Sequence, residues 1–352
     1  MPGRKFSLAK PAPDTPRALG FRMPAEWEPH EATWIAWPHN RDDWPGKFQA
    51  VPWVYADIVR RLAKVERVRI LAQDEDAERN ARRYLKKADV EMGAVEFFHH
   101  PTDRVWTRDF GPIFVKNRAG EVAITNWRFN GWAKYDNWKK DNEAPGAIAA
   151  RLGLREWKLD LVLEGGSIDV NGHGILLTTE ECLLSPVQAR NPGVFRSEIE
   201  RQMREYLGIR KVVWLGRGIA GDDTHGHVDD LARFITADTV AIASERDRSD
   251  PNYEPLRDNL LRLRTEPLNV VTLPMPEPVI FDGQRLPASY ANFYIANRLV
   301  LVPTFNDAND RVALDTLARL FPGREVVGIH STDLVWGLGT LHCMTQQQPA
   351  AG

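Results

Sequence analysis

The chain has 352 residues and a formal net charge of −2. A chain of this length can bury a large apolar core, and its length is consistent with one or two domains. Acidic and basic residues are interspersed and nearly balanced, which argues against nucleic acid or an acidic membrane surface as a partner. We therefore expect a globular protein with no nucleic-acid partner and no membrane partner.

The first 22 residues contain charges and prolines but no apolar stretch. This composition does not resemble a secretory signal, and no stretch of the chain is long and apolar enough to cross a bilayer. The two cysteines, Cys182 and Cys343, cannot form a disulfide framework and suit a reducing compartment. We predict a flexible leader over residues 1–22, a single catalytic domain over residues 23–349 and a cytoplasmic location.

Further along the chain, four segments repeat one layout, in which a polar residue precedes a strand, a tight turn and a second strand. Helical patterns fit between them at residues 193–207, 253–264 and 308–321. The strongest hairpin signal is the Asn-Gly pair at 171–172, because a two-residue turn of this type needs positive φ. The four turns fall at residues 117–120, 171–172, 237–238 and 296–297.

A fifth copy of this layout begins at Cys343. If it pairs with a strand at residues 33–37, the repeats close into a ring and leave no sheet edge exposed. The polar residues that open the copies would then meet at the centre of the ring, although they are far apart in sequence. The alternative is an ordinary α+β sheet in which hairpins recur by chance. The residues expected to converge are Asp109, Glu164, His227, Asp229 and Cys343.

Cys343 is the candidate nucleophile, because glycines precede it and a His-rich segment could supply a proton acceptor. A thiol surrounded by carboxylates suits either a metal or a planar cation such as a guanidinium, which pairs with carboxylates through two hydrogen bonds. Zinc sites favour thiolates and histidines at short spacing, and only the run from His225 through His227 to Asp229 fits that pattern. We therefore predict no metal, and we keep a metallohydrolase and a non-catalytic binder of guanidines or polyamines as alternatives.

Six motifs lie in collinear order over about residues 23 to 349: Met23–His30, Trp106–Pro112, Leu163–Ser167, Gly221–Asp229, Ala288–Ala296 and His342–Gln348. Together they resemble the agmatine deiminase family, the bacterial-type relatives of peptidylarginine deiminases. The resemblance implies an α/β pentein fold, a β/α-propeller of five ββαβ-type modules around a pseudo-fivefold axis. It also implies hydrolysis of agmatine to N-carbamoylputrescine and ammonia in putrescine and polyamine biosynthesis, without a cofactor. Family members often form dimers or larger assemblies, which leaves a homo-oligomer open.

The resemblance also implies a role for each candidate residue. The nucleophile falls on Cys343, which would form a covalent thiouronium, and the general acid and base falls on His227. The carboxylates that bind the guanidinium fall on Asp109 and Asp229. The remaining catalytic carboxylate falls on Glu164, which we expect to hydrogen-bond His227 or a substrate nitrogen.

Other residues are candidates for binding the rest of the substrate. Asp223 could receive the distal ammonium of agmatine, although it could instead cap a helix. Trp106 and Trp132 could flank the aliphatic part of the substrate, whereas Cys182 is expected to be a buried thiol.

The sequence departs from the family pattern at Leu338 and Thr340, where a run of glycines and an asparagine are usual. His225 stands where Asn or Asp is more familiar, and the glycine pair that usually follows Trp132 is absent. These departures leave open a second interpretation, a deiminase of another guanidine such as arginine, peptidylarginine or a small guanidino compound.

Overall fold

The computed structural model describes residues 13–352, which form an α/β fold with six sheets. In five of these sheets an antiparallel strand pair is extended by a strand that runs parallel to one member of the pair. The strands of four of these sheets are β4 (Ile113–Lys116), β5 (Val122–Arg128) and β6 (Arg155–Val162); β7 (Asp169–Val170), β8 (Ile175–Thr179) and β9 (Lys211–Leu215); β10 (Ala232–Phe234), β11 (Thr239–Ser244) and β12 (Asn269–Pro274); and β15 (Tyr294–Ile295), β16 (Leu299–Thr304) and β17 (Glu325–His330).

The fifth sheet joins the two ends of the described chain. Its order is β18 (Gln346–Pro349), β1 (His30–Ala36), β2 (Arg67–Ala72) and β3 (Val95–His99), with β18 antiparallel to β1. The predicted pairing of the segment after Cys343 with the strand near residues 33–37 is therefore confirmed. The sixth sheet is a separate hairpin of β13 (Ile280–Phe281) and β14 (Gln284–Arg285).

In each of the five similar sheets, helical segments separate the antiparallel pair from the parallel strand. The predicted helices at 193–207, 253–264 and 308–321 are found as α6, α7 and α8. Among residues 13–352, no helix combines the length and the apolar character needed to span a membrane. The helices are α1 (Val51–Leu62), α2 (Glu75–Lys87), α3 (Thr107–Phe110), α4 (Lys139–Leu152), α5 (Glu180–Leu184), α6 (Arg196–Leu207), α7 (Tyr253–Arg264) and α8 (Ala308–Leu320).

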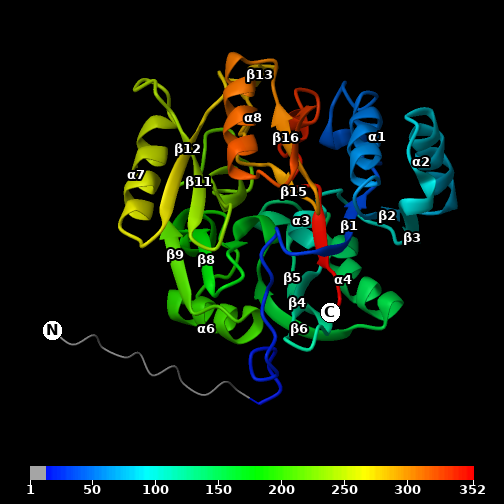
Figure 1. Cartoon of the computed structure of the whole chain (residues 1–352), viewed down its shortest axis with the longest axis horizontal. Coiled ribbons are helices and arrows are strands. Elements are labelled where there is room, and N and C mark those ends of the chain that lie inside the picture. The colour runs from blue at the N-terminus through cyan, green and yellow to red at the C-terminus, as the bar shows by residue number, and fades with distance from the viewer. Residues whose placement is uncertain (1–12) are drawn as a thin grey trace.

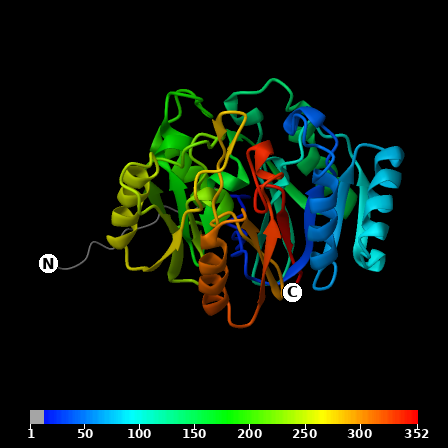
Figure 2. The same cartoon turned by 90° about the horizontal axis from the view of Figure 1, so that it is seen from above.

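The longer helices lie around the outside of the molecule, and the red C-terminal strand lies beside the blue strand β1 near the middle (Figure 1). Seen from above, the yellow helix α7 and the cyan helix α2 lie at opposite ends, with the red C-terminal segment between them (Figure 2). Strand β18 and the segment before it therefore lie near the middle of the fold, where they can contact residues from several sheets.

The hairpin of β7 and β8 shows how the sequence specifies a turn. Gly172 has a φ of +69°, in the left-handed region that glycine adopts without strain. The side-chain oxygen of Asn171 accepts hydrogen bonds from the backbone N–H groups of His173 and Ile175, each at 2.9 Å. All four predicted hairpins are confirmed by antiparallel strand pairs.

The expected closure into a ring without sheet edges is wrong, because the strands belong to separate sheets and the described residues form no closed sheet. Neighbouring sheets meet instead through short helical turns. Helix α3 contacts the 3-10 turn η4 (Gly165–Ser167), and η4 contacts the 3-10 turn η5 (Val228–Asp230). The backbone of these turns does not extend a strand ladder, so edges remain within each sheet.

The flexible leader expected over residues 1–22 is packed against the rest of the chain in its described part. The backbone N–H of Arg17 donates to the carbonyl of Glu205 at 3.0 Å, and Arg22 forms an antiparallel bridge with Lys116. The side chain of Phe21 joins a buried apolar cluster. Burial of this aromatic ring gives the segment a fixed position that its polar composition did not indicate. Residues 1–12 of the predicted leader lie outside the described part.

One fully buried cation, the guanidinium of Arg233, ties the first residues of the fold to two of its sheets. Its Nε lies 2.6 Å from Oδ2 of Asp169, its Nη2 lies 2.9 Å from Oε2 of Glu26, and its Nη1 donates to the carbonyl of Phe293 at 2.6 Å. Burial opposes the charge of Glu26, but Arg233 and then His342 hold the pKa of this carboxyl well below its usual value. Removing Arg233 would leave two buried carboxylates without their main counter-ion.

We expect Arg233→Met to lower the free energy of unfolding by about 3–5 kcal/mol, the usual cost of stranding buried charges. The matched control is Arg311→Met. The side chain of Arg311 is 89% exposed, and its Nε lies 3.6 Å from Oδ2 of Asp315, so this variant removes an ion pair at the surface. Loss of that exposed pair should cost less than about 1 kcal/mol. Urea titration followed by far-UV circular dichroism measures both. Equal midpoints for the two variants would contradict this description of Arg233.

Candidate active site

The five candidate residues lie where the chain enters one strand of an antiparallel pair. Asp109 is in α3 before β4, and Glu164 precedes η4 and β7. His227 and Asp229 lie at η5 before β10, and Cys343 lies three residues before β18. The structure brings all five side chains together although they span more than two hundred positions.

The imidazole of His227 is at the centre of this group. Its Nδ1 lies 3.7 Å from Oδ1 of Asp109 and 4.0 Å from Oδ1 of Asp229. Its Nε2 lies 3.6 Å from Oε2 of Glu164. These ion-pair distances exceed those of ordinary hydrogen bonds. Among the described residues, neither ring nitrogen of His227 has a hydrogen-bond partner.

Gly166 explains why glycine is needed in the Leu163–Ser167 motif. A Cβ at this position would lie 2.6 Å from Nδ1 of His227 and 2.7 Å from Oδ1 of Asp109, which is too close for real atoms. The Gly166 N–H also donates to Oδ1 of Asp109 at 3.1 Å. The missing side chain therefore lets backbone and functional groups share a small volume.

Asn292 holds the Cys343 thiol in place. Its Nδ2 donates to Sγ of Cys343 at 3.1 Å and to Oδ1 of Asp230 at 2.9 Å. Its Oδ1 accepts from the Thr340 hydroxyl at 2.7 Å and from the His342 N–H at 3.0 Å. One buried amide therefore fixes both the loop around Cys343 and its sulfur. We did not assign Asn292 a role from the sequence, although it lies in the Ala288–Ala296 motif.

The thiol of Cys343 lies among negative charges. Its Sγ is 3.9 Å from Oδ2 of Asp229. Burial raises the pKa of Cys343 well above its ordinary value, and the charges of Asp229, Asp230 and Asp109 raise it further. Without a bound cation the sulfur is therefore held as a thiol. A cation placed among these carboxylates would favour the thiolate.

Asp109 and His227 have shifted pKa values of related origin. Burial raises the pKa of Asp109 to about 6, opposed by the neighbouring His227. Burial disfavours the charged imidazole of His227, but the charge of Asp109, followed by contacts with Cys182 and Glu164, raises its pKa well above the ordinary value. The buried imidazole is therefore suited to carry a proton.

Glu164 is held ionised by a cation that sequence reasoning missed. Burial opposes its charge, but Arg190 and then His227 lower the pKa of Glu164 to about 2. Arg190 Nε donates to Oε1 of Glu164 at 2.9 Å, and both side chains are fully buried. Only Oε2 of Glu164 then remains to face His227. Arg190 lies outside the six motifs, so no motif signalled it.

A second histidine, His342, fixes Asp229. Its Nδ1 lies 2.7 Å from Oδ2 of Asp229, and its Nε2 lies 2.7 Å from Oε2 of Glu26. Each ring nitrogen of His342 therefore faces one carboxylate oxygen. Burial opposes the ionised form of Asp229, but the hydrogen bond from His342 holds the pKa of Asp229 below its usual value. Glu26 and His342 both lie in the quoted motifs, but the sequence did not indicate that they meet.

A cavity of about 380 Å³ leads to these groups and is lined by Trp106, Asp109, Trp132 and Cys343. Trp132 Nε1 donates to Oδ2 of Asp109 at 2.8 Å, so this indole both lines the cavity and orients the carboxylate. A cavity of this size suits a small ligand rather than a macromolecule.

The structure places Asp223 at the cavity but not as a free carboxylate. It forms an ion pair with Lys134, and the Tyr135 hydroxyl donates to its Oδ2 at 2.6 Å. The cavity is also lined by Asp43, whose Oδ1 lies 2.6 Å from Nη1 of Arg104. Oδ2 of Asp43 is buried without a hydrogen-bond partner among the described residues. Sequence reasoning missed Asp43, because nothing in its local pattern separates it from a surface aspartate.

Comparison with known proteins identifies the family of this chain. The model of the Porphyromonas-type peptidyl-arginine deiminase family matches residues 22–349. The chain belongs to this family. It is 36% identical to a protein named agmatine deiminase from Pseudomonas aeruginosa, with 96% of this chain and 97% of that protein covered.

Two solved structures of agmatine deiminases are also similar. The enzyme of Enterococcus faecalis is 33% identical, with a TM-score of 0.89 and coverage of 97% of this chain and 100% of that chain. A variant enzyme from C. jejuni with substrate bound is 29% identical, with a TM-score of 0.87 and coverage of 94% of this chain and 97% of that chain. The similarity thus extends over nearly the whole of each chain.

Departures from the pattern usual in this deiminase family have structural counterparts. Leu338 lines the cavity with a φ of +67°, and His225, Trp132 and Ala133 have φ values between 56° and 62°. Glycine adopts this left-handed region freely, whereas other residues are strained there. At Thr340, another departure, the hydroxyl donates to Oδ1 of Asn292.

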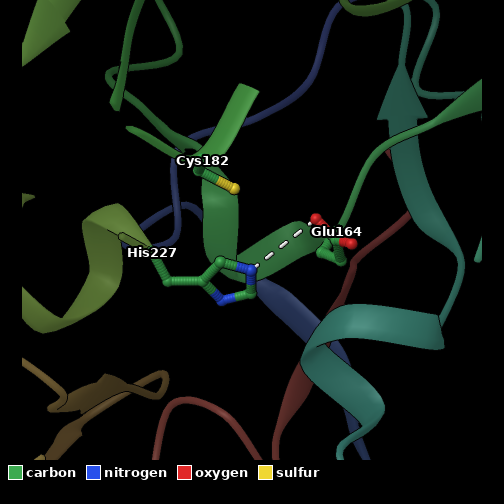
Figure 3. Close-up of side chains that lie close together, drawn as sticks. All are labelled: Glu164, Cys182 and His227. Atoms are coloured by element: carbon green, nitrogen blue, oxygen red, sulfur yellow. Dashed lines mark ion pairs between the residues drawn. The ribbon is translucent and has the colours of Figure 1, made fainter. Parts of the chain in front are cut away.

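Two groups of buried side chains in this deiminase could hold a metal ion. One is formed by Glu164, Cys182 and His227, and the other by Asp229, Asp230 and Cys343. His225, which looked like a ligand in the sequence, belongs to neither group, and its Nε2 lies 3.1 Å from the Ser185 hydroxyl. Cys182 is buried as predicted, but its sulfur faces His227 and Glu164 (Figure 3).

We predict that Asp229→Asn speeds alkylation of Cys343 by iodoacetamide, because loss of the nearby charge lowers the pKa of the thiol. A fall of about one unit would raise the thiolate fraction roughly tenfold near neutral pH. The measurement is made in a Cys182→Ala background, so that one cysteine remains. Asp333→Asn, at a half-exposed pair with Lys47, is the control and should leave the rate unchanged. An unchanged or slower rate in Asp229→Asn would show that this carboxylate does not hold the sulfur as a thiol.

Proposed function

We propose that this protein is an agmatine deiminase, which hydrolyses agmatine to N-carbamoylputrescine and ammonia through a thiouronium on Cys343. The observation that carries the proposal is the buried thiol of Cys343 at a small cavity, among the carboxylates of Asp109, Asp229 and Asp230. Relatives and solved structures named agmatine deiminase support the substrate. Neither a metal nor an organic cofactor enters the proposed reaction.

In the first step, Asp109 and Asp229 bind the guanidinium of agmatine through charge-assisted hydrogen bonds. Trp132 and His342 orient these carboxylates. The bound cation offsets the negative charges that raise the pKa of Cys343, so the thiol loses its proton as the substrate arrives. The enzyme thereby produces its thiolate only when a target is present.

In the chemical steps, Sγ of Cys343 attacks the guanidinium carbon and forms a tetrahedral adduct. His227 gives a proton to one nitrogen, the C–N bond breaks and ammonia leaves. His227 then takes a proton from a water molecule that attacks the thiouronium carbon. The added hydroxyl then loses its remaining proton to solvent as the C–S bond breaks, so the thiolate is regenerated and the ureido product leaves. Glu164, held by Arg190, keeps the imidazole in position and favours its protonated form.

The tail of agmatine would extend along Trp106 and Trp132 toward the opening of the cavity. Asp223 is our candidate for the distal ammonium, which would exchange with Lys134 as the partner of this carboxylate. Tyr135 already fixes Asp223 by its hydroxyl. The exchange replaces one ammonium by another and conserves the charge balance.

A second candidate is a deiminase of another guanidine, such as free arginine, peptidylarginine or a small guanidino compound. One observation favours it: Arg104 lines the cavity, and its Nε is buried without a hydrogen-bond partner among residues 13–352. A substrate carboxylate could bind this guanidinium. Agmatine lacks such a group, so a panel of guanidines separates the two candidates.

Finer features of the fold and setting belong to the same proposal. The repeated order of hairpin, helix and parallel strand supports five ββαβ modules around a pseudo-fivefold axis, within one catalytic domain over residues 23–349. The product N-carbamoylputrescine would feed polyamine biosynthesis in the cytoplasm. A homo-oligomer is compatible with this function but is not required by it.

We expect the wild-type protein to release ammonia and a ureido product from agmatine faster than from arginine or arginyl peptides. Cys343→Ser should abolish turnover, because an alcohol is a far weaker nucleophile than a thiolate. Colorimetric assay of ureido product across this panel tests both points, with circular dichroism as the folding control. A preference for arginine would favour the second candidate, and substantial turnover by Cys343→Ser would exclude the covalent route.

The pH dependence of kcat/KM should reflect the ionisation of Asp109, because the ionised carboxylate binds the guanidinium. With a pKa of about 6 in the free protein, Asp109 is protonated below that pH, so kcat/KM should rise through about pH 6. Asp109→Asn should lower kcat/KM by a factor on the order of 30 or more and remove this rise.

Asp43→Asn is the matched control for this profile, because burial also raises the pKa of Asp43 to about 6. This variant should keep the acidic rise in kcat/KM. If the rise disappears with Asp43 and persists without Asp109, the assignment of Asp109 is wrong.

The tail contact is tested with agmatine and with butylguanidine, which has the same guanidinium but no ammonium. Asp223→Asn should raise KM for agmatine by roughly tenfold, equivalent to about 1.4 kcal/mol, and leave butylguanidine much less affected. Asp43→Asn tests the alternative carboxylate in the same cavity. If Asp223→Asn raises KM equally for both substrates, Asp223 does not bind the ammonium and has only a structural role.

A further inference from the structure

We propose that Glu164, Cys182 and His227 form a binding site for a thiophilic divalent cation, Zn²⁺ above all, and that a bound cation inhibits the enzyme by occupying the imidazole of His227. The inhibition rests on the proposed function, whereas the binding does not. This cation would be an inhibitor, which is distinct from the catalytic metal of a metallohydrolase.

The geometry of the three side chains suits one metal ion. Their ligand atoms all lie within 4.8 Å of one another. Nε2 of His227 and Oε2 of Glu164 are 3.6 Å apart, close to the ~3.4–3.6 Å expected between two ligands of a tetrahedral zinc ion. The sulfur of Cys182 points toward the space beside these two groups (Figure 3). A small rotation of the cysteine would complete three bonds and leave a fourth position for water.

The potential ligand atoms also lack other partners. Among the described residues, Nε2 of His227 and Oε2 of Glu164 have no hydrogen bond, although both side chains are almost completely buried. A buried polar atom without a partner costs about 1–3 kcal/mol. A cation bound between them would satisfy both atoms at once.

The surrounding charge favours a cation. Asp109 and Asp229 lie within 4.0 Å of the His227 ring, and both face the place where the guanidinium would bind. Arg190 opposes a cation, but its Nε is bonded to Oε1 of Glu164, on the other oxygen of that carboxylate. Binding would release the thiol proton of Cys182 and any second imidazole proton to solvent, as metal ligation requires.

The ligand types select the metal. Sulfur, imidazole nitrogen and one carboxylate oxygen form a set typical of Zn²⁺, whereas Mg²⁺ and Ca²⁺ prefer oxygen ligands alone. The competing group of Asp229, Asp230 and Cys343 is less available. Its Asp229 Oδ2 is bonded to His342, and its Asp230 Oδ1 and Cys343 Sγ both accept from Asn292.

Binding is tested with the full chain, stripped of metal by EDTA and titrated with Co²⁺, whose sulfur charge-transfer band reports thiolate ligation. Cys182→Ala and Cys343→Ala are matched variants, because each removes one of the two thiols. We expect Cys343→Ala to bind one equivalent of Co²⁺ and to keep the charge-transfer band. Added Zn²⁺ should displace the bound Co²⁺. Cys182→Ala should lose the band and bind Zn²⁺ more weakly, by more than the roughly 10–100-fold typical of an outer-shell change.

The opposite pattern, with the band lost in Cys343→Ala and kept in Cys182→Ala, would place the cation on the nucleophile and overturn the proposal. Absence of binding in the wild-type protein, or equal binding by both variants, would overturn it as well. These spectra do not depend on turnover, so they remain decisive if agmatine proves not to be the substrate.

Inhibition is tested by agmatine hydrolysis at increasing Zn²⁺, with each variant compared with its own metal-free rate. The wild-type rate should fall, and Cys182→Ala should need at least tenfold more Zn²⁺ for the same fractional loss. Mg²⁺ at equal concentration should have no effect. Equal sensitivity of Cys182→Ala and wild type would refute inhibition through this site.

Discussion

Three carboxylates, those of Asp109, Glu164 and Asp229, lie within 4.0 Å of the His227 ring while being almost completely buried. Like charges in a low-dielectric interior repel strongly, and each needs a counter-charge. Arg190 supplies one for Glu164, and His342 holds Asp229. Asp109 contacts His227, the Trp132 indole and the Gly166 N–H, and burial raises its pKa to about 6 although His227 opposes this. The site therefore gathers several buried carboxylates around one imidazole, and we propose that this negative character favours a cationic substrate.

The fold supplies this concentration of charge from separate sheets. Each of the five candidate residues precedes a strand of an antiparallel pair, so the strands fix its position while the side chain remains outside the ladder. Arg233 and Glu26 connect this arrangement to the N-terminal segment, and His342 extends the connection to the site. One buried network therefore connects Arg233, which stabilises the fold, through Glu26 and His342 to Asp229, the proposed substrate-binding carboxylate.

Local sequence patterns predicted the hairpins, three of the helices and the pairing of the two chain ends, because strand alternation and turn residues such as Asn171-Gly172 act over short distances. Family motifs located the five residues that converge. The sequence did not predict that the sheets would stay separate, nor that Lys134 would pair with Asp223, because such contacts depend on where distant segments meet. The sequence also did not predict that Asn292, Arg190 and Cys182 lie beside the site. A single buried amide, guanidinium or thiol leaves no periodic pattern that would indicate its neighbours.

The central claim is that Cys343 attacks a guanidinium carbon held by buried carboxylates. Its most direct test is rapid acid quenching of the protein mixed with agmatine, followed by mass spectrometry of the peptide containing Cys343. The account predicts a transient adduct on Cys343 with the mass of agmatine less ammonia, which decays as ureido product appears. Product formation without any adduct on that peptide, at times when turnover is under way, would contradict it.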